Sequence, residues 1–482
     1  MSNTTDMTND AGTPRKLTGY EFYRKTLGAP KYIVAPMVDQ SEYAWRMLSR
    51  RYGAQLCYTP MLHAKLFSES EFYATEFFTT GDLDRPLIVQ FCANDPEILL
   101  KAAKKVEAHC DAVDINLGCP QGIAKKGHYG AFLMEKWDVV AKMVKILHDN
   151  LSIPVTCKIR VFPDVDKTIQ YAQMIEQAGC QLLTVHGRLR EQKGQYTGLA
   201  DWEQIRRVKQ AVSIPVFANG NILYFEDIQR CLDATGVDGV MSAEGNLYNP
   251  ALFANQYPIT YEIAQEFLDI CRRTPKSSNV ACVKGHLFKI FRPVLNTYVD
   301  LRSQLGDVAS LDDCQNLINE YRSRLEPLVT ETETTVDERG YKCIPEYRCQ
   351  PYIRTADLGR TADDVIPKIS GCHDVRFGSG DVEAGVGNGK HKVDDDADGT
   401  SNKRAKHEQF CSCGTTNLVS GRCTKQLCKA CCNKLGVLVA KASKKRTKKH
   451  KQENGATNPQ KKDEPELIDW LCESHRTKRG TS

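Results

Sequence analysis

The sequence predicts an α/β protein built on a (β/α)8 TIM barrel. Eight short apolar segments, most with β-branched residues, start at intervals of about 24 to 42 residues, as successive βα units require. The stretches between them place apolar residues at every third or fourth position, which is the period of a helix. A six-stranded dinucleotide-binding sheet is the alternative, but no G-x-G-x-x-G follows any segment. The expected strands are Tyr32–Val38, Leu56–Leu62, Pro86–Cys92, Ala112–Leu117, Pro154–Arg160, Gln181–Arg188, Pro215–Asn221 and Gly239–Gly245.

Helices are expected between these strands and again after the last of them. The clearest amphipathic stretches in the barrel region are Pro96–His109, Trp137–Asn150, Asp166–Gly179 and Trp202–Val212. From about residue 259 the pattern is helical only, which predicts a small helical domain behind the barrel. Its expected helices are Glu262–Arg272, Val283–Val299 and Leu311–Leu325.

The length of 482 residues is too great for one compact core and indicates several domains. Apolar density falls after residue 345, and residues 371–400 hold seven glycines and a run of three aspartates, a composition typical of disorder. The expected order is a polar N-terminal tail (1–28), the barrel (29–258), the helical domain (259–345), a largely disordered linker (346–407), a cysteine-rich module (408–436) and a basic tail (437–482).

Composition indicates an ordinary soluble protein, with 41% hydrophobic and 26% charged residues. No apolar run approaches the roughly 20 residues that span a bilayer. The first 16 residues lack the apolar core of a signal peptide. We therefore expect a reducing, cytoplasmic compartment, in which the 20 cysteines serve purposes other than disulfide bonds.

The segment from Asp114 to Pro120 ends a strand in a way that suggests chemistry. Its sequence, D-I-N-L-G-C-P, is typical of an apolar strand that stops at a Gly-Cys-Pro turn. Asn116 and Cys119 would then project together from the carboxyl end of a buried strand, where barrel enzymes build their active sites. A buried strand with an incidental cysteine is the alternative, since free cysteines are often core residues.

Polar side chains and glycine turns also end most of the other strands. Burying them inside a barrel is costly unless a ligand satisfies them, and flavin mononucleotide (FMN) fits. Gln90 can bond the pyrimidine edge of the flavin, Lys158 can hold negative charge near N1, and the last glycine turns can present N–H groups to a phosphate. A lone lysine or histidine is usually structural, but several at successive strand ends favour a site. The strand-end residues are Ala35, Pro36, Met37, Gln90, Asn116, Lys158, Arg160, His186, Arg188, Asn219, Gly220, Asn221, Ala243 and Glu244.

Six motifs, in order and at natural spacing over about residues 30–255, resemble those of the tRNA-dihydrouridine synthases. They are V-A-P-M-V-D from Val34, P-L-I-V-Q-F from Pro86, D-I-N-L-G-C-P from Asp114, V-T-C-K-I-R from Val155, T-V-H-G-R from Thr184 and A-N-G-N from Ala218. The resemblance implies an FMN-containing barrel with a helical domain, which reduces the C5–C6 double bond of uridines in tRNA with NADPH or NADH. Two phrases, starting at Met37 and Ser242, resemble the eukaryotic branch that modifies uridines 16 and 17 of the D-loop.

By position, the resemblance makes Cys119 the general acid. Hydride would pass from N5 of the reduced flavin to C6 of the uracil, and Cys119 would protonate C5. A thiol near its ordinary pKa is mostly protonated at neutral pH, which suits an acid. The resemblance also matches most of the strand-end residues to the family's FMN contacts. They are Ala35, Pro36, Met37, Gln90, Lys158, His186, Asn219, Gly220, Asn221, Ala243 and Glu244. Many members carry Gly-Arg where this chain has Ala243-Glu244, so backbone amides or another residue must replace a cationic phosphate contact.

The target base must be turned out of the stacked tRNA into the barrel mouth. Asn116 is expected to hold either the uracil or the loop of Cys119, and the sequence does not separate these roles. Arg160 and Arg188 are further candidates for substrate contact. The loop after Cys119 can meet the RNA backbone, although surface lysines are more often only solvated. Its basic residues are Lys125, Lys126 and His128.

Six cysteines crowd into residues 411–432, in a segment with little other core. Thiolates at such spacing can wrap a tetrahedral Zn²⁺, so the segment predicts a zinc module without deciding which four residues bind. The candidates are Cys411, Cys413, Cys423, Cys428, Cys431 and Cys432. Cys472 and His475 can complete a second site, while an iron–sulfur cluster or a reactive disordered segment is the alternative.

The tail from Lys441 to Lys462 has nine Lys or Arg against one Glu, and such a run attracts polyanions. It predicts RNA contact or a nuclear import signal.

The expected partners are tRNA and NAD(P)H, with no membrane and no obligate protein partner. One rival function is a free-pyrimidine reductase or dihydroorotate-type dehydrogenase, which needs neither helical domain nor tail. The other is a non-catalytic RNA-binding protein, against which the intact Cys119, Lys158 and His186 argue.

Overall fold

The structure is a computed structural model of the chain, and it describes residues 16–194, 197–274, 279–330 and 334–354. The predicted zinc module, the basic tail and the linker beyond residue 354 lie outside the described residues. Among the helices that are described, none is both long and apolar enough to cross a membrane.

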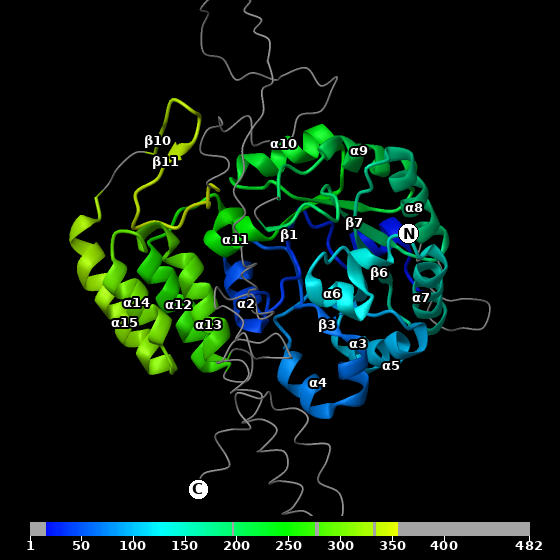
Figure 1. Cartoon of the computed structure of the whole chain (residues 1–482), viewed down its shortest axis with the longest axis horizontal. Coiled ribbons are helices and arrows are strands. Elements are labelled where there is room, and N and C mark those ends of the chain that lie inside the picture. The colour runs from blue at the N-terminus through cyan, green and yellow to red at the C-terminus, as the bar shows by residue number, and fades with distance from the viewer. Residues whose placement is uncertain (1–15, 195–196, 275–278, 331–333, 355–482) are drawn as a thin grey trace, which may run out of the picture. The chain divides into compact units, whose positions relative to one another are not determined.

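Eight parallel strands close into a barrel, which confirms the predicted fold class (Figure 1). Neighbours along the chain pair with one another, β2 pairs directly with β4, and the ring closes where β1 pairs with β9. The barrel strands are β1 (Tyr32–Val34), β2 (Leu56–Tyr58), β4 (Leu87–Cys92), β5 (Ala112–Leu117), β6 (Val155–Arg160), β7 (Leu182–His186), β8 (Val216–Asn219) and β9 (Gly239–Ser242). The two-residue β3 (Leu62–His63) only adds to the carboxyl end of β4.

The predicted strands lie at the right places, but most run too far. The first was expected to continue to Val38 and ends at Val34, because Pro36 has no N–H to give to a ladder. The second was expected to reach Leu62 without a break, and Pro60 separates β2 from β3. Strand β5 has the predicted bounds.

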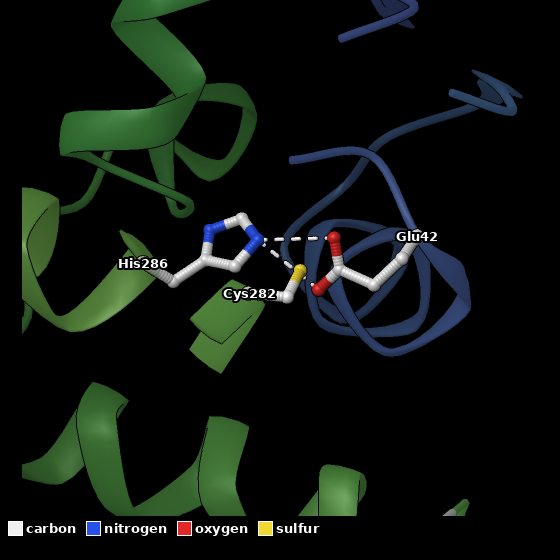
Figure 2. A group of neighbouring side chains, drawn as sticks. All are labelled: Glu42, Cys282 and His286. Atoms are coloured by element: carbon white, nitrogen blue, oxygen red, sulfur yellow. Dashed lines mark hydrogen bonds and ion pairs between the residues drawn. The ribbon is translucent and has the colours of Figure 1, made fainter. Parts of the chain in front are cut away.

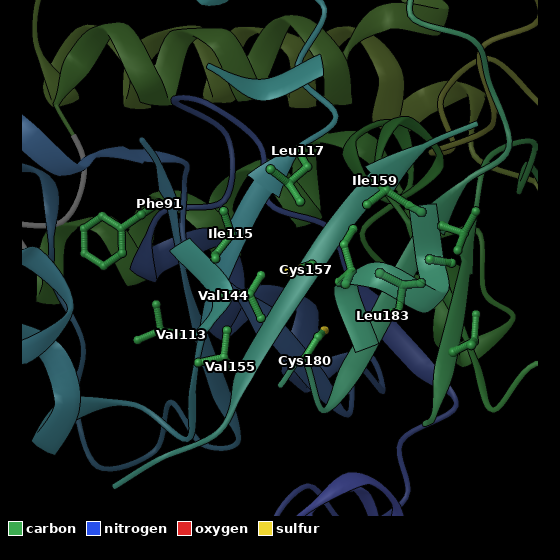
Figure 3. Close-up of a cluster of buried hydrophobic side chains, with 14 of the residues drawn as sticks. Phe91, Val113, Ile115, Leu117, Val144, Val155, Cys157, Ile159, Cys180 and Leu183 are labelled. Atoms are coloured by element: carbon green, nitrogen blue, oxygen red, sulfur yellow. The ribbon is translucent and has the colours of Figure 1, made fainter. Parts of the chain in front are cut away.

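Side chains alternate between the two faces of the barrel wall. On β5, Val113, Ile115 and Leu117 face the surrounding helices and belong to the main hydrophobic core. Figure 3 shows this outer layer, with Val144 of the helix α7 (Trp137–Asn150) lying among strand residues. The inward positions nearer the amino ends of the strands form a separate apolar core. Its members on the strands are Ile33, Leu56, Tyr58, Ile88, Ala112, Leu182, Phe217 and Met241, and Ala35 joins them just after β1.

Helices surround the strands (Figure 1). Asp95, Asp164 and Asp201 cap α5, α8 and α9 by accepting a first-turn backbone N–H, which fixes where these helices start. The helices of the barrel are α2 (Tyr43–Arg51), α3 (Ala64–Glu69), α4 (Glu71–Phe77), α5 (Pro96–Val106), α6 (Gly122–Gly127), α7 (Trp137–Asn150), α8 (Val165–Gln177), α9 (Trp202–Ala211), α10 (Glu226–Thr235) and α11 (Glu244–Tyr248).

The first helix, α1 (Gly19–Lys25), corrects the prediction of a polar tail up to residue 28. Phe22, Tyr23 and Leu27 are buried and pack against the inner core of the barrel. Three apolar side chains in a polar segment gave no clear period, so only their tertiary contacts distinguish this helix from a tail.

Four helices follow the barrel in the described residues and share a second hydrophobic core with α2. They are α12 (Thr260–Arg273), α13 (Val280–Ile290), α14 (Val299–Asp307) and α15 (Leu311–Leu325). The prediction of one helix over Val283–Val299 was wrong. Helix α13 ends at Ile290 and a single 3-10 turn follows, because Pro293 lacks the N–H that would continue the helix.

Residues 346–354 are not linker, which corrects the predicted boundary. A small antiparallel hairpin of β10 (Thr335–Val336) and β11 (Lys342–Cys343) comes first. The chain then returns to the body of the protein, where Tyr347 and Cys349 are buried. The segment is short and shows no helical or strand period, so the sequence did not reveal how closely it packs.

Candidate active site

Hydrogen bonds link a set of strand-end side chains inside the barrel. Gln90 Nε2 donates to Asp114 Oδ2 at 2.7 Å, and Asn116 Nδ2 donates to Gln90 Oε1 at 2.8 Å. Thr156 Oγ1 donates to Asp114 Oδ1 at 2.6 Å. Burial raises the pKa of Asp114 to about 6, although the bonds from Thr156 and Gln90 oppose the rise. Each of these polar groups is therefore satisfied by another, as a dry interior requires.

Lys158 is the cation of this network. Its Nζ donates to Asn219 Oδ1 at 2.9 Å, and Asn219 Nδ2 donates to Met241 O at 2.9 Å. Burial, with nearby Arg160 acting in the same direction, lowers the pKa of Lys158 to about 7. An anion placed beside Nζ would raise this pKa again and fix the positive charge. We name Gln90, Asp114, Asn116, Thr156, Lys158 and Asn219 the mouth cluster.

Cys119 lies on the loop after β5, and two side chains hold that loop. Asn116 Oδ1 accepts from the N–H groups of Gly118 and Cys119, at 3.1 and 2.9 Å. Arg160 Nε donates to Gly118 O at 2.8 Å. A Cβ on Gly130 would lie 2.7 Å from Cys119 O, so only glycine fits behind the loop. Burial raises the pKa of the Cys119 thiol, which therefore keeps its proton at neutral pH.

A cavity of about 110 Å³ opens beside the ends of β7, β8 and β9, several times the space that one water needs. Gly220 has a φ of +118°, and a Cβ there would lie 2.6 Å from the Ala200 Cβ. A Cβ on Gly245 would lie 2.3 Å from Ile222 O. Glycine is thus required on two sides of the cavity.

Arg188 brings positive charge to this cavity. Its Nη1 lies 3.0 Å from His186 Nε2, and its Nη2 donates to Asn221 Oδ1 at 2.8 Å. Burial lowers the pKa of His186 well below its usual range, helped by the neighbouring cations. The ring is therefore neutral and accepts from Arg188. A fixed guanidinium beside tight glycine turns suits an anionic group such as a phosphate.

Comparison with known proteins agrees with this geometry. The family model for dihydrouridine synthase (Dus) matches residues 33–339. The chain belongs to the dihydrouridine synthase family. The predicted family is therefore confirmed. A tRNA-dihydrouridine(16/17) synthase NAD(P)(+)-like protein of Mus musculus is 47% identical over 431 residues, covering 87% of this chain and 88% of the relative. The tRNA-dihydrouridine(16/17) synthase of Saccharomyces cerevisiae is 49% identical over 378 residues, covering 72% and 89%.

A more distant relative marks the shared part of the family. The human tRNA-dihydrouridine(20a/20b) synthase NAD(P)+-like protein is 40% identical over 241 residues, which is 49% of this chain and 75% of the relative. The match to the 16/17 proteins thus extends over far more of this dihydrouridine synthase than the match to the 20a/20b protein.

The predicted cofactor residues of this dihydrouridine synthase gather at one end of the barrel. Ala35, Pro36 and Met37 follow β1, and Met37 N–H donates to Ser41 Oγ at 2.9 Å. Gln90 and Lys158 belong to the mouth cluster. The remaining ones all line the cavity described above. They are His186, Asn219, Gly220, Asn221, Ala243 and Glu244.

The predicted substrate residues divide into two kinds. Asn116 uses both ends of its amide within the protein, on the Cys119 loop and on Gln90. Arg160 is buried and also donates from Nη1 to Leu189 O at 2.7 Å, so it ties the loops after β5 and β7 together. Arg188 lines the cavity instead. Lys125 and Lys126 are exposed on α6, just beyond Cys119.

Two features of this synthase were missed by sequence reasoning. The outer wall of the cavity comes from beyond the barrel, from Tyr341, Tyr352, Ile353 and Arg354. No local pattern indicated this, because the segment shows neither a helical nor a strand period.

The second feature is a buried group of Glu42, Cys282 and His286 (Figure 2), whose ligand-type atoms lie within 4.8 Å of one another. We name it the junction cluster, because Glu42 precedes α2 of the barrel and the other two lie on α13. The spacing of Cys282 and His286, one helical turn apart, was the signal that could have found them.

Proposed function

We propose that this chain is an FMN-dependent tRNA-dihydrouridine synthase that reduces the C5–C6 double bond of D-loop uridines 16 and 17, with NADPH or NADH as reductant. Family membership and the names of the 16/17 relatives support this function. The observation that carries it is the Cys119 thiol on a loop that Asn116 and Arg160 hold beside the mouth cluster.

The residues present fit FMN. Arg188 and the glycine turns at Gly220 and Gly245 form a cradle for a phosphate, in which an added Cβ would collide. Lys158 can hold the negative charge of a reduced flavin, since its pKa of about 7 rises when an anion lies beside it. When bound, FMN supplies the hydride that C6 of the uracil receives.

The chain's own residues supply the proton that C5 of the uracil receives. Cys119 Sγ–H gives its proton to C5 of the uracil, and its raised pKa keeps the thiol protonated until that moment. Asn116 and Arg160 fix the backbone on both sides of Gly118, so the thiol is positioned before the base enters. The resulting thiolate takes a proton back from solvent before the next turnover.

Recognition of tRNA requires a larger surface than the barrel mouth. We propose that α12–α15 and the exposed Lys125 and Lys126 contact the RNA backbone, because phosphates dominate affinity for nucleic acids. The predicted zinc module and basic tail lie outside the described residues and stay predictions from the sequence. A cytoplasmic location and a nuclear import signal in the tail also stay predictions. Metal content of the purified full chain, and of a variant lacking the six clustered cysteines, tests the zinc.

The function is tested by anaerobic reoxidation of the flavin. The purified protein is reduced with NADPH, and flavin absorbance is followed after adding unmodified tRNA or free uracil. We expect reoxidation by tRNA alone, and its loss in Cys119→Ala. Reoxidation by the free base would support a metabolic reductase instead. A colourless protein that binds no added FMN would leave the RNA-binding function.

A further inference from the structure

The segment from the second hairpin strand onward is built onto the barrel and reaches the cavity. We name residues 341–354 the C-terminal strap. Lys342 Nζ near its start pairs with Glu226 on α10 at 2.7 Å. Tyr352 near its end stacks on Tyr248 of α11, with ring centroids 5.2 Å apart. Both ends of the strap are therefore anchored to helices that follow the last two barrel strands.

Arg354 is the strap residue that brings charge to the cavity. Its Nη2 donates to both carboxylate oxygens of Glu244, at 2.8 and 2.6 Å. The two residues are 110 positions apart in the chain, so this pair exists only because the strap returns. Within the described residues, the Nε and Nη1 groups of Arg354 have no hydrogen-bond acceptor. One edge of the guanidinium is thus oriented by Glu244 while other N–H donors are left for a ligand.

The local charge favours an anion. Burial lowers the pKa of Lys289, Glu244 opposes this, and Arg354 and Arg292 lower it further. Arg292 also lies over the ring of Tyr352, 4.9 Å from its centroid. Lys289 and Arg354 thus both interact with the Glu244 carboxylate, with Arg292 near Lys289, while Arg188 lines the cavity wall. A phosphate entering the cavity would meet positive charge from two separate parts of the chain.

We propose that Arg354 anchors the phosphate of FMN from the C-terminal strap, with Glu244 as its positioning residue. This rests on the proposed use of FMN. Strand β9 is followed by a carboxylate, that of Glu244, and the arginine that neutralises it comes from the C-terminal strap. The cofactor site is therefore completed only when the strap has folded onto the barrel, so removal of the strap would leave the phosphate with fewer cationic contacts.

The test compares FMN with riboflavin, which has the same ring system and no phosphate. Each flavin is titrated into the apo-form of the full chain, and the quenching of flavin fluorescence gives the dissociation constant. We expect Arg354→Ala to weaken FMN binding by about 10- to 100-fold, as loss of a charged hydrogen-bond donor does, and to leave riboflavin binding unchanged. Arg354→Lys keeps the charge without the fork and should fall between.

Arg339→Ala is the matched control, since Arg339 lies just before the strap, pairs with Asp337 and does not line the cavity. It should bind both flavins as the unaltered chain does. Equal weakening of FMN and riboflavin in Arg354→Ala would overturn the proposal, because it would indicate a general loss of the strap's fold. Unchanged FMN affinity would overturn it as well. If the unaltered chain binds neither flavin, the proposed cofactor itself fails, together with this inference.

Discussion

Two buried polar clusters of this protein use similar side chains in opposite ways. In the mouth cluster, successive hydrogen bonds join Asp114, Gln90 and Asn116, and Asn116 is in turn hydrogen-bonded to the Cys119 loop. The junction cluster is a local contact between two segments of the chain (Figure 2). His286 Nε2 lies 3.0 Å from Glu42 Oε2, and Cys282 Sγ donates to Asp39 O at 2.9 Å. Trp45 stacks on the His286 ring with centroids 4.0 Å apart.

The difference teaches that residue type does not decide function. A cysteine, a histidine and a glutamate in contact are the ligands that zinc prefers. Yet burial raises the pKa of Cys282, with Glu42 and Asp39 acting in the same direction, and a metal ligand must be the thiolate. We interpret the junction cluster as a structural contact between the segment before α2 and helix α13. The mouth cluster keeps a cation of tunable charge beside an accessible thiol, which is what a reaction needs.

The largest expected effect lies at the mouth. Cys119→Ala should lower tRNA-dependent reoxidation of the flavin by about 10²- to 10⁴-fold, the usual contribution of a general acid. Reduction of the flavin by NADPH should be unchanged, because that step does not use the thiol. Stopped-flow absorbance measures both steps. Cys110→Ala, which removes a buried core thiol, is the control and should keep its activity.

At the junction, the expected effect is on stability. Glu42→Gln should lower the free energy of unfolding by about 1 to 3 kcal/mol, since it replaces the buried carboxylate that His286 Nε2 contacts at 3.0 Å. Urea denaturation measures this. The double variant with His286→Gln should lose less than the sum of the two single variants. A chelator that destabilises the unaltered chain more than Cys282→Ala would instead indicate a bound metal and contradict the structural interpretation.

A pH titration separates the two clusters further. The pKa of Lys158 falls from an ordinary 10.5 to about 7 in the folded chain. Between these values the unfolded chain binds a proton that the folded chain does not, so this residue's contribution to stability rises with pH. We expect the urea midpoint of the apo-protein to rise from pH 7 to pH 9, and Lys158→Met to remove most of that rise. A rise that persists in Lys158→Met would assign it to other groups.

The smallest expected effect concerns the rim of the mouth. Changing both Lys125 and Lys126 to alanine should raise the KM for tRNA about two- to five-fold at low salt, and less at high salt, because exposed phosphate contacts are screened. Lys142→Ala, which removes an exposed lysine from α7, should have no effect. Steady-state kinetics at two ionic strengths decides, and equal KM values for all variants would remove the α6 lysines from the tRNA surface.

Much of the barrel could be predicted because its signals are local. Ala112–Leu117, Trp137–Asn150 and Leu311–Leu325 have the bounds that hydrophobic periodicity predicts. The errors have equally local causes: Pro293 ends α13 early, and α1 contains too few apolar residues to show a period.

The sequence by itself determined the barrel, the family and which polar residues stand at strand ends, because strand period and strand order fix which side chains share the carboxyl face. Only the tertiary structure decided that Asn116 holds the Cys119 loop, that Arg354 meets Glu244, and that Glu42 meets His286. Each of these contacts joins a loop or helix whose path depends on packing rather than on a repeating pattern. Hydrophobic periodicity can be recognised within a short stretch of sequence, because it depends only on neighbouring residues. Contacts between distant segments depend instead on how the helices, the hairpin and the strap pack against the barrel.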